Sequence, residues 1–285
     1  MKRLEYTAGN SARDMFLFDS MTEITNFIDP TLFVNKDSSF TGRDGLNTWD
    51  NTSNATRDEW VSGLQTLGKF VEDLKKADLP PIKSKKRRME FSDEGDEVDY
   101  DKMMSGNPEF FKTCVREESD GPTTVTIVID TTTPANRQSE DILWRGAAAI
   151  ALTILLEDRG YTVELWCVNG SKLWGGKNTG VMTAVCLKKT SDPLDYSTLV
   201  NTVSGWFYRS VTFTLLETMA KHAGERTAYG YGTCHNPDQT DLDKFNDDEL
   251  RIYSSGVFSY SGALRLMEDE LKRIVKPQTD MAENN

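Results

Sequence analysis

Thr123-Thr124-Val125-Thr126-Ile127-Val128-Ile129-Asp130 is the stretch that decides the fold. Its β-branched side chains and its length are typical of a single β-strand. Gly121-Pro122 precedes it as a turn, and a polar loop, residues 131–138, follows it. The stretch therefore predicts the first strand of a sheet. Asp130 would stand at its carboxyl end, where open α/β sheets bind their ligands.

The residues after this loop predict a helix and a second strand. Ser139 has the side chain of an N-cap and acidic residues follow it, so we expect a helix over residues 141–159. Gly160 is suited to end that helix. Residues 161–168 are again apolar and β-branched, which favours a strand. Strand, helix and strand form a βαβ unit, whose two strands run parallel with a right-handed crossover.

Weaker patterns on both sides of this unit extend the prediction. We expect a third strand at residues 181–187, helices at 194–203, 211–222 and 260–275, a last strand at 250–253, and an exposed acidic loop at 238–249. Before the unit, apolar residues between Phe16 and Ile28 recur at helical spacing, residues 37–56 have loop composition, and a helix follows from Asp58 to Lys76.

The expected fold is an α/β, Rossmann-like, mainly parallel sheet with helices on both faces, plus an N-terminal, mostly helical extension. The expected domains are an extension at residues 1–89, a lead-in segment at 90–119, the α/β domain at 120–277 and a disordered tail at 278–285. Lys83, Lys85 and residues 86–88 are basic, and the acidic run at 90–101 follows. We interpret the two runs as a solvated linker or hairpin, with nucleic-acid contact by the basic half as the alternative.

Composition limits the classes of function. The chain has 285 residues, 38% of them hydrophobic, which is enough to bury a core. The net charge of −12 argues against general nucleic-acid binding, because an acidic surface repels phosphate. No apolar run approaches the roughly 18 residues that span a bilayer, and the first residues do not resemble a signal peptide. We therefore expect no membrane contact and a cytoplasmic location. The four cysteines form no C-x-x-C pair and are interpreted as structural thiols.

Three stretches resemble the opening of a von Willebrand factor A domain: residues 125–130, 145–149 and 156–165. Residues 98–109 resemble the lead-in segment of an uncharacterised group of phage and bacterial proteins with a degenerate version of that domain. The resemblance covers roughly residues 90–170. It implies a von Willebrand factor A-like sheet in a phage-encoded protein, which would place the chain in the host cytoplasm.

The resemblance also implies a degenerate metal site. Active A domains end their first strand in Asp-x-Ser-x-Ser and hold Mg²⁺ with these side chains and a later Thr and Asp. Here Asp130 and Thr132 match the first two positions, whereas Pro134 offers no hydroxyl at the third. Mg²⁺ requires near-octahedral oxygen ligands, so the loss weakens the site. The alternative is that Asp130 caps the loop or the start of the helix.

Other residues are candidates for binding rather than catalysis. Arg137 lies near the expected helix N-terminus, where an anion is favoured. Aromatic and arginine side chains often anchor protein interfaces, although aromatic residues also fill cores. The candidates of this kind are Trp206, Tyr208, Tyr229 and Tyr231. No G-x-S-x-G or phosphate-binding loop occurs, and the neighbours Cys234 and His235 lack a second pair for zinc.

We predict a non-enzymatic protein-interaction or assembly module that binds a protein partner. One alternative is a metal-dependent phosphoesterase or nuclease, which needs a second acid beside Asp130. Candidates for that acid are Glu140, Asp141 and Asp192. The other alternative is a virion structural or scaffold component.

Overall fold

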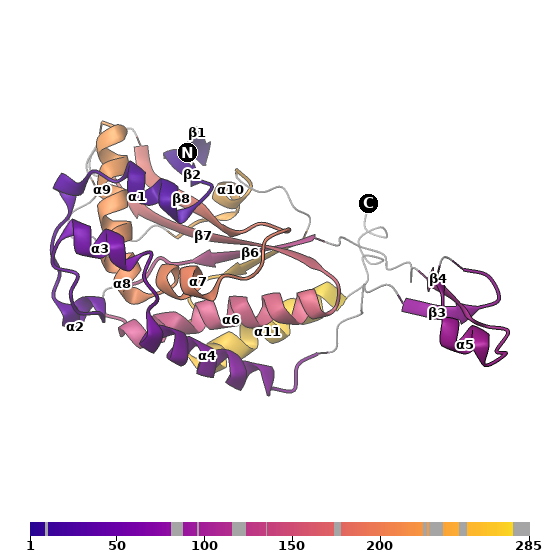
Figure 1. Cartoon of the computed structure of the whole chain (residues 1–285). Helices are drawn as coiled ribbons and strands as arrows, with labels where there is room; N and C mark the ends of the chain where they lie inside the picture. The colour runs from indigo at the N-terminus through magenta and orange to yellow at the C-terminus, as the bar shows by residue number, and fades with distance from the viewer. Residues whose placement is uncertain are drawn as a thin grey trace.

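Six strands form the main sheet, in the order β1-β2-β8-β7-β6-β9 (Figure 1). The computed structural model describes residues 1–8, 11–80, 88–95, 97–115, 124–134, 136–173, 178–224, 227, 236–244 and 250–275. The strands are β1 (Lys2–Ala8), β2 (Ser11–Phe18), β6 (Thr124–Asp130), β7 (Thr162–Lys172), β8 (Asn178–Lys188) and β9 (Arg251–Ser254). The pairs β2/β8, β6/β7 and β6/β9 are parallel, whereas β1/β2 and β7/β8 are antiparallel. The α/β class and a mostly parallel, mixed sheet are therefore confirmed.

The predicted βαβ unit is present within this sheet, next to its edge strand β9. β6 lies between β7 and β9 and is parallel to both. The connection from β6 to β7 contains α6 (Ser139–Asp158). Val125, Ile127 and Ile129 alternate along β6 and are fully buried in the core that α6 helps to form. Asp130 accordingly stands at the carboxyl end of an interior strand.

The third predicted strand, β8, runs antiparallel to its neighbour β7. Only residues 173–177 lie between the two strands. A parallel crossover needs about a dozen residues or more, so this short connection forces a hairpin. β8 thereby presents its other edge to β2, with which it pairs in parallel.

The N-terminal residues differ from the prediction of a mostly helical extension. β1 and β2 form an antiparallel hairpin, and β2 joins the main sheet beside β8. The helix expected between Phe16 and Ile28 is wrong for its first part, because β2 continues to Phe18 and α1 (Met21–Phe27) begins afterwards. The expected loop at residues 37–56 contains the short helices α2 (Ser38–Thr41) and α3 (Trp49–Ala55).

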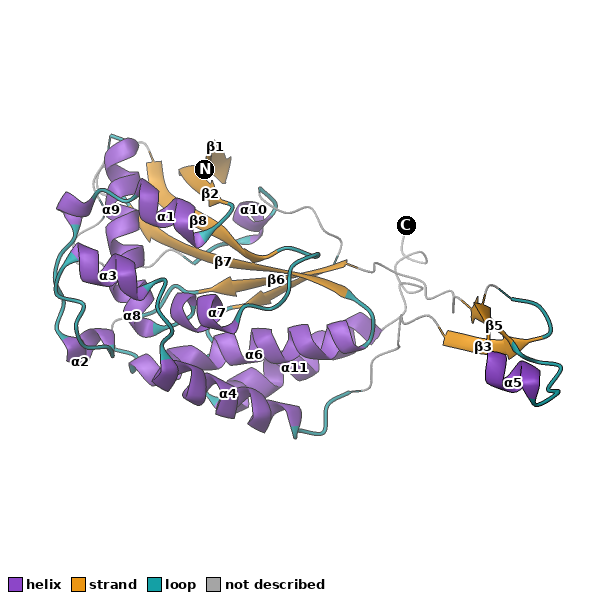
Figure 2. Ribbon diagram, viewed as in Figure 1, coloured by secondary structure: helices purple, strands orange, loops and turns teal. Residues whose placement is uncertain are grey.

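Most helices cover one face of the sheet (Figure 2). Besides α1, α2, α3 and α6 they are η1 (Pro30–Leu32), α4 (Val61–Lys75), α7 (Tyr196–Thr202), α8 (Gly205–Phe207), the π-helical turn η2 (Tyr208–Thr212), α9 (Phe213–His222) and α11 (Tyr260–Val275). α4 and α11 pack on α6, and Gly146 of α6 lies so close to Val203 that a Cβ atom would meet its side chain at 2.4 Å. The predicted helices on both faces are thus unequally distributed: the opposite face carries α10 (Gln239–Leu242), whose Leu242 packs on Val128.

A second, small sheet lies apart from the main one (Figure 1). It has the order β3-β5-β4, and all its described pairings are antiparallel. Its elements are β3 (Arg88–Ser92), β4 (Glu97–Val98), α5 (Tyr100–Met104) and β5 (Phe111–Val115). We call the described residues 88–95 and 97–115 the arm, and the other described residues the body. The arm begins two residues before the predicted lead-in segment at 90–119 and otherwise lies within it, whereas the predicted tail at 278–285 lies outside the described residues.

Candidate functional site

Asp130 occupies the predicted position but is not presented to solvent. Its side chain is 1% exposed. Oδ1 accepts a hydrogen bond from the backbone N–H of Thr132 at 2.9 Å, which caps the loop. Oδ2 accepts hydrogen bonds from the hydroxyls of Tyr253 at 3.0 Å and Ser255 at 2.8 Å. Burial, together with the charge of Asp130, raises the pKa of the Tyr253 phenol above its ordinary value, so the phenol stays a donor.

A fully buried arginine holds the loop that follows Asp130. Arg145 projects from α6 and donates to the backbone carbonyls of Asp130 at 2.6 Å, Thr131 at 2.8 Å and Thr132 at 2.9 Å. It also donates to the hydroxyl of Thr133. A guanidinium presents five donors in a fixed planar fork, so it can satisfy several carbonyls of one tight loop at once. The loop is therefore shaped by Arg145.

The predicted metal site does not fit this arrangement. Mg²⁺ requires near-octahedral oxygen ligands. Both carboxylate oxygens of Asp130 already accept hydrogen bonds, and the cationic Arg145 contacts the same loop. Thr132 Oγ1 is buried without a hydrogen-bond partner among the described residues. No group of three His, Cys, Asp or Glu side chains converges in the described part of the chain. We therefore assign no role to Mg²⁺ here.

The acids considered as partners of Asp130 lie elsewhere. Glu140 and Asp141 are in the first turn of α6, and Asp192 accepts a hydrogen bond from the backbone N–H of Lys189 at 3.2 Å, in the turn after β8. The hydrogen bonds that the structure describes for Asp130 come from a backbone N–H and two hydroxyls. The geometry thus gives no support to a carboxylate pair at this edge of the sheet.

A polar network on the second face of the sheet was missed by the sequence analysis. Asp241 of α10 is fully buried and accepts hydrogen bonds from Tyr6 at 2.5 Å and Arg13 at 2.6 Å. Arg13 also pairs with Asp238 at 2.7 Å. Burial raises the pKa of Asp238, but the hydrogen bond and the positive charge of Arg13, together with hydrogen bonds from the backbone N–H groups of Asp241 and Thr240, outweigh it and hold that pKa below its ordinary value.

This α10 network, made by Tyr6, Arg13, Asp238 and Asp241, connects the two edges of the sheet. The Tyr253 hydroxyl also donates to the carbonyl of Pro237 at 3.2 Å, so α10 is tied to β9 as well as to β1 and β2. The expected exposed loop at 238–249 therefore contains a short helix, in which Asp241 and Leu242 are buried, whereas residues 238–240 are exposed as expected. The signal was the spacing of Asp238 and Asp241, which form a capping box in the structure.

A pocket of about 260 Å³ lies beside α10 and β9. Its cationic lining comes from Arg251 and Arg273. Arg251 pairs with Asp243 at 2.9 Å, and Arg273 pairs with Glu270 at 2.7 Å. Because both guanidinium groups are already paired with carboxylates, this pocket has little net positive charge with which to bind an anion.

The predicted interaction residues fall into different environments. Trp206 and Tyr208 are 0% and 2% exposed, so their prediction as interface anchors is wrong: they belong to the core under α8, η2 and α9. Arg137 is exposed, and its guanidinium lies 4.6 Å from the centre of the Phe258 ring. Tyr229 and Tyr231 lie outside the described residues.

The N-terminus of α6, where an anion was considered, is closed by protein groups. Ser139 does not cap the helix. Its hydroxyl donates to the carbonyl of Thr41 at 3.2 Å, and Gln138 occupies the N-cap position. Arg209, from the π-helical turn, donates to Ser139 Oγ at 3.2 Å and to the carbonyl of Arg137 at 2.5 Å. These groups hold the start of α6 against α2 and the π-helical turn η2.

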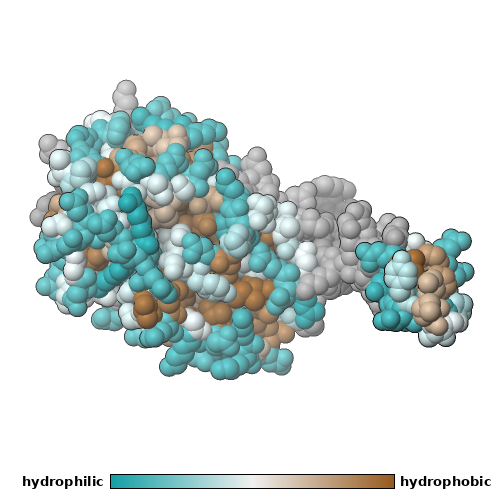
Figure 3. Space-filling model, in the orientation of Figure 1, coloured by the Kyte–Doolittle hydropathy of each residue, from teal (hydrophilic) through white to brown (hydrophobic). Residues whose placement is uncertain are grey.

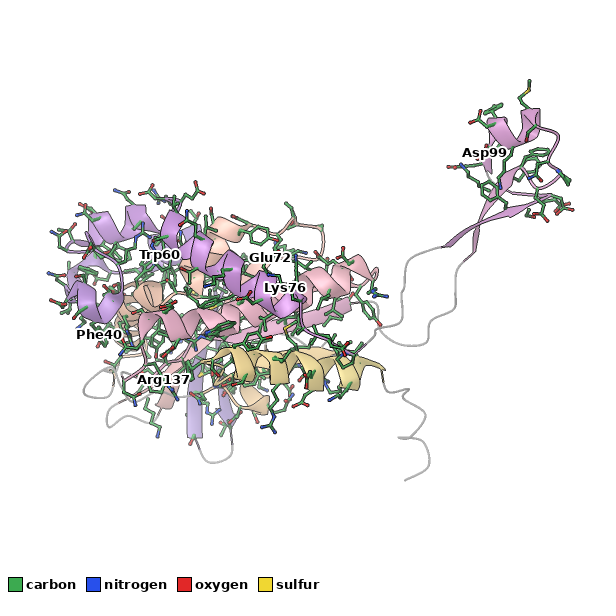
Figure 4. The ribbon with its side chains drawn as sticks, turned by 90° about the horizontal axis from the view of Figure 1, so that it is seen from below. Phe40, Trp60, Glu72, Lys76, Asp99 and Arg137 are labelled. Carbon is green, nitrogen blue, oxygen red and sulfur yellow. The ribbon has the colours of Figure 1, made fainter. Side chains whose placement is uncertain are left out.

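Exposed apolar side chains mark the arm instead. Nine large hydrophobic residues are exposed in the described chain, and four of them lie in the arm: Phe91, Tyr100, Met103 and Met104. Figure 3 shows hydrophobic residues gathered on the arm and bordered by hydrophilic ones. In Figure 4, Asp99 of the arm lies far from Trp60 and Arg137 of the body. The arm is therefore the second candidate site, and it carries exposed apolar side chains among polar ones.

The sheet, its closed polar edge and the arm with its exposed apolar residues define an α/β protein with a small antiparallel module set apart from its main sheet. The chain belongs to a family described as a domain of unknown function, DUF7192, whose model matches residues 11–273. No curated protein and no solved structure matches the chain. Among the described residues, no helix has the length and hydropathy needed to cross a membrane.

Proposed function

We propose that this protein is a non-enzymatic interaction or assembly module in which the body is a scaffold and the arm binds a protein partner. The observation that carries the proposal is the concentration of exposed apolar side chains on the arm, with Tyr100 70% and Met104 81% exposed. Contiguous exposed apolar surface on a protein marks interaction sites. Aromatic residues and methionine are enriched at such sites.

The body supports this proposal by the way its polar groups are used. At the carboxyl edge of the sheet, Asp130, Tyr253 and Arg145 are bonded to one another or to the backbone around them. A general base or a metal ligand must instead be available to a substrate. A rigid, internally bonded edge suits a scaffold that positions another element.

We also propose that the sheet is a diverged von Willebrand factor A-like sheet of phage origin. The support for such a sheet is the parallel set β7-β6-β9, with Asp130 at the carboxyl end of its central strand, and the phage origin rests on the resemblance of residues 98–109 alone. A virion or scaffold role is compatible with binding through the arm and is one form of the same proposal. The phosphoesterase or nuclease alternative receives no support from the described geometry at Asp130.

Photo-crosslinking in the cells that express the protein tests the proposal. A photoreactive phenylalanine at position 100 reports on the arm, and the same residue at position 196 reports on the body, where Tyr196 is also exposed. We expect a discrete light-dependent adduct with another protein from position 100, lost with Met104→Ser, and none from position 196. Equal adducts from both positions, or no adduct from position 100, would contradict the proposal.

A further inference from the structure

The exposed surface of the arm is built on one face of α5. Tyr100, Met103 and Met104 are spaced at i, i+3 and i+4, which places them side by side on a helix. All three are exposed. In an amphipathic helix such a stripe normally faces its own protein. Here Tyr100 and Met104 are 70% and 81% exposed and Met103 is 37% exposed, so the described residues leave much of the apolar surface of the stripe uncovered.

The basic residues beside α5 are turned toward the small sheet. Lys102 Nζ lies 3.0 Å from the centre of the Phe91 ring, a cation–π contact. Lys112 pairs with Asp99 at 3.3 Å. Asp99 caps α5 by accepting from the backbone N–H of Lys102 at 3.1 Å, and this bond lowers the pKa of Asp99. These contacts fix the orientation of α5 and use both lysines within the arm.

Acidic residues are frequent in the arm that carries the stripe. The described residues of the arm contain seven acids and three bases, a net charge of −4. The exposed acids are Asp93, Glu94, Glu97, Asp101 and Glu109. Because Lys102 and Lys112 are engaged inside the arm, its exposed surface combines the apolar stripe with an excess of acidic side chains.

We infer that the outward face of α5 binds a cationic amphipathic segment of a partner protein, an inference that rests on the proposed function. Apolar side chains of such a segment would cover Tyr100 and Met104, and its lysines or arginines would meet the exposed acids. Charge disfavours the other occupants. The net charge of −4 of the described arm opposes nucleic acid and anionic lipid, and a second copy brings a chain of net charge −12.

Binding of designed peptides to the full chain tests the partner class. The probe is a labelled Leu/Lys peptide with leucines on one helical face. Its controls are the same peptide with Glu for Lys, and a scrambled Leu/Lys peptide. Fluorescence anisotropy should show binding of the amphipathic Leu/Lys peptide only. Equal binding of the scrambled peptide would mean non-specific attraction to an acidic protein and would overturn the inference.

Two pairs of variants separate the apolar and the electrostatic contributions. Tyr100→Ser with Met104→Ser keeps every charge, and we expect it to raise the dissociation constant of the peptide by about tenfold or more. Asp93→Asn with Asp101→Asn should raise the dissociation constant severalfold and make binding less dependent on salt concentration. The matched body variants, Val61→Ser with Tyr196→Ser and Asp44→Asn with Glu59→Gln, should bind as the unmodified chain does. Circular dichroism verifies that each variant is folded.

The outcomes also separate this inference from the proposed function. An arm-dependent crosslinked adduct without peptide binding would keep the interaction role and refute the cationic partner class. Binding of vesicles of phosphatidylserine and phosphatidylcholine by the unmodified chain, lost with the Tyr100 and Met104 double variant, would identify a lipid surface instead. Self-association in analytical ultracentrifugation that the same double variant abolishes would identify a second copy. Either result would overturn the inference.

Discussion

The body buries its apolar side chains, whereas the arm exposes them. In the body, strands and helices bury continuous clusters of apolar residues, and even large polar groups such as Arg145 and Asp241 are enclosed and bonded. In the arm, no hydrophobic side chain among those described, at residues 91–95 and 97–112, is fully buried. The difference teaches that apolar residues serve stability in one region and remain available for contact in the other. Substitutions in the two regions should therefore separate folding from binding.

The largest effect is expected for Arg145→Met. The substitution would leave the buried carbonyls of Asp130, Thr131 and Thr132 without the donor that holds them. We expect a loss of about 3–5 kcal/mol in the free energy of unfolding, measured by denaturant titration. Arg265→Met is the control, because that side chain is 85% exposed and pairs with Asp269 at 3.6 Å. A loss no larger than that of the control would show that the loop does not depend on Arg145.

A smaller effect is expected for Asp241→Asn. The change removes the charge that Arg13 and Tyr6 contact inside the protein, and it leaves the arginine buried without its main partner. We expect a loss of about 2–4 kcal/mol in the free energy of unfolding. Asp243→Asn, two residues away on the exposed side, should cost much less, because its pair with Arg251 is on the surface. Equal losses would mean that α10 does not tie β1 and β2 to the sheet.

The third effect depends on pH. The folded state raises the pKa of Tyr253, so the stability that this neutral phenol contributes is present below about pH 10 and is lost as pH rises further. Tyr253→Phe should lower the free energy of unfolding by about 1 kcal/mol at pH 8. Above pH 10 the free energy of unfolding of the variant should fall less steeply than that of the unmodified protein, with a difference in slope of up to about 1.4 kcal/mol per pH unit. Unfolding titrations from pH 8 to 11 measure both, and parallel pH profiles would contradict the expectation.

The smallest effect on stability is expected in the arm. Tyr100→Ser with Met104→Ser removes exposed side chains, so the free energy of unfolding should change by no more than about 0.5 kcal/mol. Hydrogen exchange of the arm amides tests whether the arm keeps its own structure in this variant. Loss of protection in α5 would show that the two residues stabilise the arm, and the contrast with the body would then fail.

The sequence predicted the elements whose local signals agree. The β-branched run before Asp130, the long alanine-rich helix after it and the last amphipathic helix all appear as β6, α6 and α11. The N-terminal strand was misread because Met15, Phe16, Leu17 and Phe18 are consecutive apolar residues. A strand covered on both faces has that composition, and so does a short buried helix, so periodicity cannot separate them.

The site was harder to predict because its residues depend on distant segments. Position 130 was placed correctly at the end of an interior strand, but its burial depends on Tyr253 and Ser255, more than 120 residues away. Trp206 illustrates the same limit, because the sequence alone does not show whether an aromatic side chain lies in a core or at an interface. Asp241 was taken for a solvated acid because its partners, Tyr6 and Arg13, are more than 225 residues away.

The place of β2 beside β8 has a consequence for synthesis on the ribosome. β2 ends at Phe18, and its partner strand begins at Asn178. At about 5–20 residues per second, the first hairpin waits on the order of ten seconds or more before that strand exists. Asp241, which neutralises Arg13, emerges later still. The nascent hairpin thus carries an unpaired apolar edge through most of translation, a state in which chaperones commonly shield a chain.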